Sequence, residues 1–389
     1  MHATELGHGG IRGRRRRVVL SAVTAAALAL AGAPGAGSAG RALETQASLD
    51  RLASRLVQAG APGAIVAVRT PGGVRRAAAG AASLRPHVAL RPTDTFRIAS
   101  VTKPFVAAVV LQLAGERRLR LSDPVERWLP GQVPNGRAIT LRELLGHTSG
   151  LFDYDDDDAW VKARIGNPAR SWTARELVAV ATRNPPRFRP GTDWSYSNTN
   201  YVLLGLVVEA VTRHTLGDEL RARIIRPLAL HSTSYPGGTA IGRRAAHGYQ
   251  GRAPGLPIPV GRLVDVTTRV SPSAWGAGQL VSNADDLTRF FAALLRGGVV
   301  PTMELREMKT PVGGGGPVPF TAPYGLGLDI VHTSCGTAYG HVGDMPGYRN
   351  IVLASGDGGR VAAVMVNVAS ARLRWSSIED AATTALCGA

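Results

Sequence analysis

The sequence predicts an α+β protein in which strands from both ends of the chain form one antiparallel sheet, flanked by helices. Residues 63–81 have the pattern of a β-hairpin, and residues 326–368 have the pattern of several further strands. Residues from about 121 to 295 have mostly helical periodicity, broken by loops rich in Pro, Gly and Asp. Strands at both ends with helices between them indicate a single sheet with a mostly helical domain inserted into it.

The N-terminal elements follow from spacing and turn residues. Residues 41–60 are predicted to form an amphipathic helix, since leucines recur there at helical spacing. Residues 63–70 and 74–81 are predicted to pair as strands around the turn at Pro71, Gly72 and Gly73. A helix is then expected to begin at Ser100 and to end near residue 115, with Pro104 in its first turn, where a missing N–H costs nothing.

The later elements are a set of helices followed by strands. The clearest helices of the middle region are predicted at residues 141–145, 174–182, 201–213 and 284–295. The C-terminal strands are predicted at residues 326–332, 337–342, 348–355 and 361–368, and a closing helix at 376–386.

The first forty residues have the pattern of a secretory signal. Five arginines between residues 12 and 17 precede about 14 mostly apolar residues, and small residues around 33–39 offer cleavage sites. An uncleaved membrane anchor is the alternative, and Arg16 and Arg17 also fit a twin-arginine signal. We therefore divide the chain into a signal segment, residues 1–40, and one domain, residues 41–389. We expect a secreted monomer with no stable membrane span after cleavage.

Charge excludes some functions. The 389 residues carry a net charge of +17, but the arginines are scattered and lack the aromatic interleaving that nucleic-acid binding needs. The one acidic cluster, Asp153 with residues 155–158, lacks the spaced ligands and glycine turn of a calcium loop, so we interpret it as a solvated loop.

The two cysteines, Cys335 and Cys387, favour one disulfide in an exported chain. No metal or organic cofactor is expected.

The first candidate catalytic motif is a Ser–x–x–Lys sequence, Ser100 to Lys103. The chain has only three lysines, so Lys103 is not there to supply general positive charge. Residues three apart on a helix share a face, which brings the amine within reach of the hydroxyl. A lysine of lowered pKa can activate a serine nucleophile, although an N-cap serine followed by a surface lysine would have the same sequence.

Two later motifs could complete such a site. Tyr196 and Asn198 lie in a turn before a helix, where a phenol could transfer protons and an amide could hold a substrate. His341 and Gly343 lie on a predicted strand, whose edge could pair with an extended substrate. The N–H of Asp344 could form an oxyanion hole with the N–H of Ser100. Each motif alone is also compatible with an ordinary turn or strand.

The order and spacing of the three motifs resemble the serine penicillin-recognising enzymes, in particular the D-alanyl-D-alanine carboxypeptidases of Streptomyces type and the related class C β-lactamases. The resemblance covers about residues 45–389. It includes the segments at residues 145–151, 275–286 and 324–328, and the spacing of the two cysteines.

This resemblance implies the β-lactamase/DD-peptidase fold and assigns roles to residues. Ser100 is the implied nucleophile, and Lys103 and Tyr196 share the proton transfers. Asn198 and His341 orient the substrate, and the Trp275 segment, Gly343 and Asp344 complete the binding site. The implied substrates are D-alanyl peptides of cell-wall peptidoglycan or β-lactams. A D-alanyl-D-alanine carboxypeptidase is therefore the first hypothesis.

Two positions depart from the carboxypeptidase pattern. Val342 stands where the carboxypeptidases have a hydroxyl residue, and Asp329 stands where they have an arginine that holds the substrate carboxylate. Arg349 is a candidate to replace that arginine. The alternatives on the same scaffold are a β-lactamase, an esterase, and a D-amino-acid peptidase or amidase. A non-catalytic penicillin-binding or sensor domain is the alternative from another class.

Overall fold

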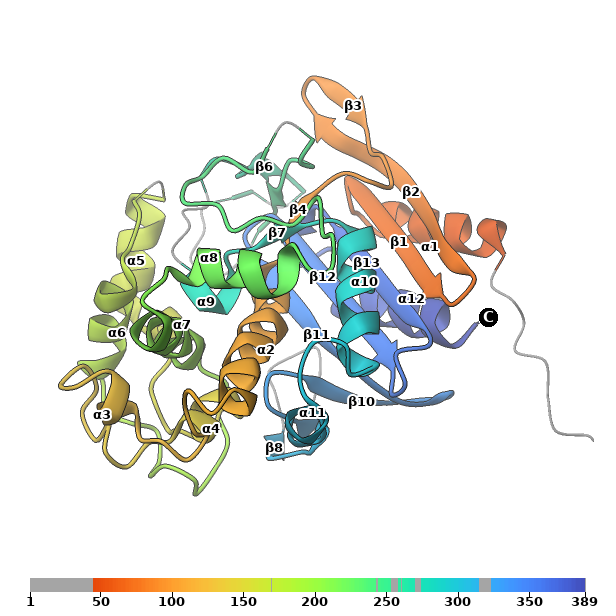
Figure 1. Ribbon diagram of the computed structural model, residues 1–389. Coiled ribbons are helices and arrows are strands. Elements are labelled where there is room, and N and C mark those ends of the chain that lie inside the picture. Colours follow the sequence, from red (N-terminus) through yellow and green to blue (C-terminus); the bar gives the residue numbers. More distant parts are fainter. Residues whose placement is uncertain are drawn as a thin grey trace, which may run out of the picture. The chain divides into compact units, whose positions relative to one another are not determined.

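Nine antiparallel strands form the main sheet, in the order β3-β2-β1-β13-β12-β11-β10-β9-β8 (Figure 1). The computed structural model describes residues 45–168, 170–242, 244–252, 258–259, 261–269, 274–314 and 323–388. The bounds of the nine strands are β1 Gly63–Thr70, β2 Gly73–Leu84, β3 His87–Ala89, β8 Gly313–Gly314, β9 Pro323–Tyr324, β10 Asp329–Thr333, β11 Gly336–Met345, β12 Tyr348–Ser355 and β13 Val361–Val366.

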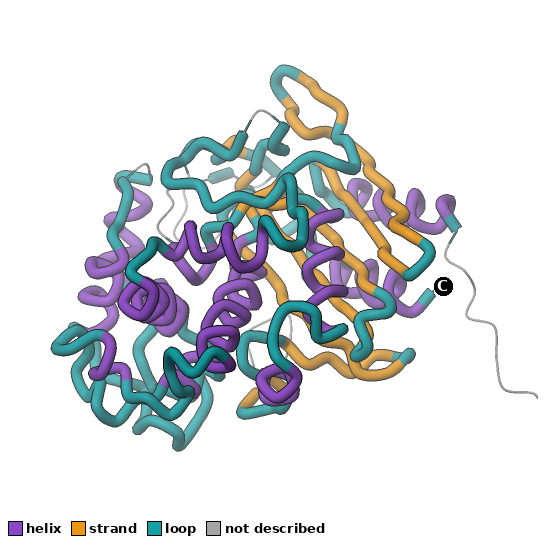
Figure 2. The backbone as a smooth tube through the Cα atoms, viewed as in Figure 1, coloured by secondary structure: helices purple, strands orange, loops and turns teal. Residues whose placement is uncertain are grey.

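The two ends of the chain meet at the centre of this sheet. Strand β1 pairs with β13, and Ala64 lies opposite Val366 in the register. Residues 63–68 of β1 and the whole of β13 are buried, because helices cover both faces of the sheet (Figure 2). The predicted α+β fold, with one sheet built from N- and C-terminal strands, is therefore confirmed.

Two helical layers enclose the sheet. On one face, α1 (Gln46–Gln58) contacts β1 and β2, and α12 (Trp375–Cys387) contacts β12 and β13. On the other face, α10 (Ala284–Leu295) contacts β1, β12 and β13. The helix α10 was included in the predicted insertion, but its contacts assign it to the layer that covers the sheet.

The inserted region is built around α2 (Thr102–Gly115) and α7 (Asn198–Thr212), which contact each other. Nearly every residue of these two helices is buried, as expected for helices that are apolar on all sides. The remaining helices are α3 Val125–Trp128, α4 Leu141–Leu145, α5 Asp158–Gly166, α6 Ala174–Thr182, α8 Leu216–Leu220, α9 Trp275–Gly278 and α11 Thr302–Lys309, with the short turns η1 Ala99–Val101, η2 Tyr154–Asp156 and η3 Arg221–Ile225.

Five short strands form two smaller sheets beside these helices. Strand β4 (Phe96–Arg97) pairs with β7 (Val281–Ser282), and β5 (Tyr249–Gln250) lies between β14 (Val368–Ala369) and β6 (Val264–Asp265). Cys335 and Cys387 form the expected disulfide, which joins the turn between β10 and β11 to the end of α12. In the described ranges, no helix is long and apolar enough to cross a membrane. The predicted signal, residues 1–40, lies outside these ranges.

Candidate active site

The sequence predicted that an α-helix begins at Ser100. In the structure, Ser100 lies instead in the short turn η1. The preceding residue, Ala99, has a left-handed backbone with φ of 48°, and α2 begins at Thr102. Such a backbone is strained for a residue with a side chain, so its surroundings must hold it. The N–H of Ile98 donates to the carbonyl of Leu280 at 3.0 Å, and Thr102 Oγ1 accepts from the N–H of Leu280 at 3.2 Å. The turn that carries Ser100 is therefore fixed from both ends.

Lys103 is fully buried, and its amine contacts three oxygen atoms. Its Nζ lies 2.9 Å from Ser100 Oγ, 2.8 Å from Asn198 Oδ1 and 2.9 Å from the carbonyl oxygen of Ala277. Burial lowers the pKa of Lys103 to about 7, although three nearby carboxylates act in the opposite direction. A neutral amine has two hydrogens and one lone pair. It can therefore donate to Asn198 and Ala277 while it accepts the proton of Ser100.

Tyr196 and Asn198 reach the same centre from the start of α7. The hydroxyl of Tyr196 donates to Ser100 Oγ at 2.9 Å. Burial raises the pKa of Tyr196 well above its ordinary value, while the hydrogen bond to Ser100 lowers it, so this phenol stays protonated near pH 7. Helix α7 begins at Asn198, three residues earlier than predicted, which fixes the Asn198 amide beside Lys103.

Two aspartates of the acidic run complete this cluster, and the sequence interpretation missed them. Asp153 is buried, and its Oδ2 accepts from the backbone N–H and from Nδ2 of Asn198, both at 3.0 Å. Asp155 Oδ2 accepts from the same Nδ2 at 3.1 Å. Burial raises the pKa of Asp153, and the like charge of Asp155 adds to this effect. The interpretation of this run as a solvated loop is therefore wrong for Asp153. It is also wrong for Asp157, which is buried and caps α5 by accepting from the N–H of Trp160 at 2.8 Å.

His341 lies on β11, and two hydrogen bonds define its tautomer. Its Nδ1 donates to the carbonyl of Val342 at 2.6 Å, so its Nε2 accepts from the hydroxyl of Tyr324 at 3.1 Å. Burial lowers the pKa of His341 to about 3, so this imidazole is neutral at physiological pH.

An aromatic layer links His341 to Tyr196. The ring of His147 lies 4.4 Å from the ring of Tyr196 and 4.9 Å from that of Tyr324, whose own centroid lies 5.8 Å from His341. His147 also has a left-handed backbone, with φ of 61°, and its ring is held by Nδ1, which accepts from the N–H of Ser197 at 3.2 Å. His147 and Tyr324 stand inside segments that carry the family resemblance, and that was the available signal for them.

Gly343 brings β11 against the turn that carries Ser100. A Cβ atom at this position would lie 2.2 Å from the carbonyl oxygen of Ile98. Only glycine therefore permits this approach of the strand. Asp344 follows and is exposed. The predicted role of its N–H in an oxyanion hole stays a prediction.

Trp275 is half-buried, and its indole N–H donates to the carbonyl of Trp172 at 3.1 Å. Helix α9, which begins at Trp275, contacts the Ser100 cluster through another residue. The carbonyl of Ala277 accepts a hydrogen bond from Lys103. The role of Trp275 in substrate binding also stays a prediction.

The two departures from the carboxypeptidase pattern differ in their surroundings. Val342 packs against the apolar cluster of the α1–α12 face. Asp329 is buried beside His341 and accepts from the N–H of Val342 at 3.2 Å. Burial raises the pKa of Asp329 to about 7, while the Val342 N–H and the Lys103 charge lower it.

Arg349, the candidate to replace the missing arginine, forms an ion pair with Asp344, since its Nε lies 3.5 Å from Asp344 Oδ1, and its role as the replacement stays a prediction. Its guanidinium donates to the carbonyls of Ser370 and Leu373 and lies 5.1 Å from the ring of Trp375. In the described part of the chain, no arginine forms a hydrogen bond or ion pair with Ser100, Lys103, Tyr196, Asn198 or His341. The described residues also contain no group of three His, Cys, Asp or Glu side chains placed to hold a metal ion.

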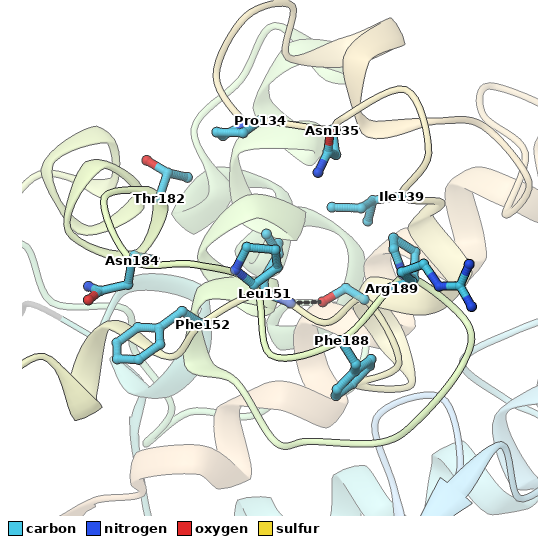
Figure 3. A pocket seen from close by; sticks show the side chains of 13 residues that line it. Pro134, Asn135, Ile139, Leu151, Phe152, Thr182, Asn184, Phe188 and Arg189 are labelled. Atoms are coloured by element: carbon cyan, nitrogen blue, oxygen red, sulfur yellow. Dashed lines mark hydrogen bonds between the residues drawn. The ribbon is translucent and has the colours of Figure 1, made fainter.

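A separate cavity of about 320 Å³ is lined by residues from the segments 134–139, 149–152 and 181–190 (Figure 3). Its lining is mostly apolar and includes Ile139, Leu151, Phe152 and Phe188. The carbonyl of Phe152 faces the start of α7, where it accepts from the hydroxyl of Thr199 at 2.8 Å. The cavity therefore lies beside the segment that contacts the start of α7, where Asn198 is. Its lining does not include the residues of the Ser100 cluster.

A serine hydroxyl between a buried amine and a phenol has the arrangement of an acyl-transfer centre. Fold and cluster together define a serine hydrolase of the penicillin-recognising type. Residues 49–382 match the protein family described as Beta-lactamase. The chain belongs to this family.

Several known proteins are similar to this chain. A D-stereospecific amidohydrolase from Streptomyces sp. is 34% identical, with a TM-score of 0.78 over 89% of this chain and 99% of that one. The D-amino acid amidase of Ochrobactrum anthropi SV3, solved with L-phenylalanine amide, is 28% identical, with a TM-score of 0.75 over 86% and 94%. Penicillin-binding protein 4 of Amycolatopsis lactamdurans is 30% identical, and the match covers 62% of this chain and 61% of that protein's length.

Proposed function

We propose that this protein is an exported hydrolase that forms an acyl-enzyme on Ser100 and cleaves amide bonds of small D-amino-acid substrates. The observation that carries the proposal is that the acidic side chains of Asp153, Asp155 and Asp329 adjoin the Ser100 cluster, while no arginine of the described residues forms a hydrogen bond or ion pair with that cluster. A carboxypeptidase must hold the terminal carboxylate of its peptide, and a site with acidic side chains and no arginine is poorly suited to that group. An amide substrate has no terminal carboxylate. The similarity to a D-stereospecific amidohydrolase and to a D-amino acid amidase supports the same substrate class.

The proposed chemistry follows from the contacts of Ser100. Neutral Lys103 accepts the proton of Ser100 Oγ, which attacks the amide carbonyl and forms a tetrahedral oxyanion. The backbone N–H groups of Ser100 and Asp344 are proposed to stabilise this oxyanion. The leaving amine takes up the proton that Lys103 accepted, and the hydroxyl of Tyr196, which also contacts Ser100 Oγ, is proposed to share this proton transfer. Water then attacks the ester on Ser100 and releases the acid.

The D-alanyl-D-alanine carboxypeptidase that the sequence suggested is the second candidate. Relatives named as penicillin-binding proteins, such as penicillin-binding protein 4 of Amycolatopsis lactamdurans, favour it. Both candidates keep Ser100 as nucleophile and differ in the leaving group, which is ammonia or an amine in one case and D-alanine in the other.

One experiment separates these candidates. The purified chain is incubated with D-phenylalanine amide, with a peptide that ends in D-alanyl-D-alanine, and with benzylpenicillin, and products and intact mass are measured. We expect release of ammonia from the amide at a kcat/KM at least about tenfold above that for release of D-alanine. Faster D-alanine release would favour the carboxypeptidase. Sustained turnover of benzylpenicillin would favour a β-lactamase, and a protein that neither takes a label on Ser100 nor turns over any substrate would be a binding domain.

A further inference from the structure

The amide of Asn198 has no hydrogen left to offer a substrate. An amide nitrogen carries two hydrogens. Here Nδ2 donates to Asp153 Oδ2 at 3.0 Å and to Asp155 Oδ2 at 3.1 Å, while Oδ1 accepts from Lys103 at 2.8 Å. The side chain that the sequence analysis assigned to the substrate therefore uses its donors within the protein.

Asp155 is the group of this cluster that faces outward. Asp153 is buried and uses both oxygens, because its Oδ1 also accepts from the N–H of Asp155 at 3.1 Å. Asp155 is exposed, and within the described residues its Oδ1 accepts no hydrogen bond, although burial of its carboxyl group among its neighbours raises its pKa. The subsite beside Lys103 therefore presents a carboxyl oxygen as a hydrogen-bond acceptor, where an unoccupied Asn198 amide would present a donor.

The position of Asp155 is fixed before any substrate binds. It lies in η2 (Tyr154–Asp156), and the N–H of Tyr154 donates to Thr199 Oγ1 at 3.2 Å. Asn198 and Thr199 both lie in the first turn of α7 and both contact η2. Because Asn198 also contacts Lys103, these contacts hold Asp155 near Lys103. A preorganised acceptor loses little conformational entropy when a ligand binds.

We infer that Asp155 binds the protonated α-amino group of the substrate residue whose carbonyl Ser100 attacks. The inference rests on the proposed function and names the part of the substrate that the site selects. In an α-amino-acid amide, the ammonium nitrogen is two covalent bonds from the attacked carbonyl carbon. A chain of hydrogen bonds through Asn198 and Lys103 links Asp155 to Ser100. An ammonium group supplies three donors and the opposite charge, which favours it over an N-acylated residue.

The balance of charge around this acceptor agrees with the inference. Burial raises the pKa of Asp155, while the charges of Arg164 and Lys103 lower it, so Asp155 loses one of two nearby cations when Lys103 is neutral and acts as the base. Arg164 on α5 is the other cation near Asp155, and its guanidinium lies 5.2 Å from the ring of Trp160. A substrate ammonium would supply the missing charge while the amine of Lys103 is neutral.

The test compares D-phenylalanine amide with its N-acetyl derivative, for the parent and for two variants of equal charge change. Asp155→Asn keeps the shape of the side chain and removes its charge. Asp158→Asn is the matched control, because Asp158 is an exposed residue of the same acidic run, in the first turn of α5. We expect the parent to prefer the free amine in kcat/KM. Asp155→Asn is expected to lower this preference by about 10- to 100-fold, and Asp158→Asn to leave it unchanged.

Each other outcome is decisive. If the parent hydrolyses both amides equally well, the proposed function stands and the inference about Asp155 fails. If Asp155→Asn lowers kcat/KM for both amides by the same factor, Asp155 only supports Asn198, and the inference fails. If the parent hydrolyses neither amide, the proposed function and the inference fail together.

Discussion

At the level of single residues, burial sets the acid–base chemistry of Lys103. Burial lowers its pKa to about 7, so the protonated form prevails below that pH and has no lone pair for the Ser100 proton. We expect the rate of Ser100 acylation by p-nitrophenyl acetate, a neutral ester, to fall about tenfold per pH unit below pH 6 and to level off above pH 8. Intact mass at successive times measures this rate, with Ser100→Ala as the background. A rate that does not change between pH 5 and 8 would contradict the role of Lys103 as base.

The sequence predicted the residues of this cluster that belong to spaced motifs, namely Ser100, Lys103, Tyr196 and Asn198. It did not predict the contacts of Asp153 and Asp155. A run of aspartates is usually solvated, and nothing in its local pattern shows that the start of α7 packs on it. Such contacts between segments far apart in the chain depend on tertiary packing.

At the level of elements, the site depends on the close approach of β11 to the turn η1. Gly343 permits this approach, since a Cβ there would lie 2.2 Å from a backbone oxygen. We expect Gly343→Ala to displace the strand and to lower the acylation rate by about 100-fold. Gly238→Ala is the control, because nothing lies within 4 Å of a Cβ at that position. Acylation of both variants by p-nitrophenyl acetate measures the effect, and equal rates would show that the approach of β11 is not needed.

The elements themselves were largely predictable, and their ends were less so. Strand β12 and helices α4, α6 and α10 have the predicted bounds, because apolar periodicity and turn residues delimit them. The predicted start of α2, at Ser100, was two residues too early. Ala99 has a left-handed backbone that its own sequence does not favour, and the contacts of Ile98 and Thr102 with Leu280 hold the turn there.

At the level of the whole molecule, the sheet that joins the two ends of the chain was predictable from its strand patterns. Its strand order was not, because nothing local to β1 or β13 shows that they are neighbours. The assignment of α10 to the sheet rather than to the inserted region has the same cause. Its apolar face fits either position, and only the contacts with β1, β12 and β13 decide between them.

The disulfide fixes the last helix to this sheet and should affect stability more than catalysis. Cys335 and Cys387 are 52 residues apart, and closing a loop of this length stabilises the fold by about 4 kcal/mol in the chain-entropy model. We expect the Cys335→Ser, Cys387→Ser double variant to have a Tm lower by about 5 °C. Its acylation rate at 25 °C should equal that of the parent, since both sulfur atoms lie beside Thr333, at the far end of β10 from Asp329. Calorimetry and acylation on the same samples measure both quantities. A large loss of acylation without a change in Tm would show that the end of α12 supports the site rather than the fold.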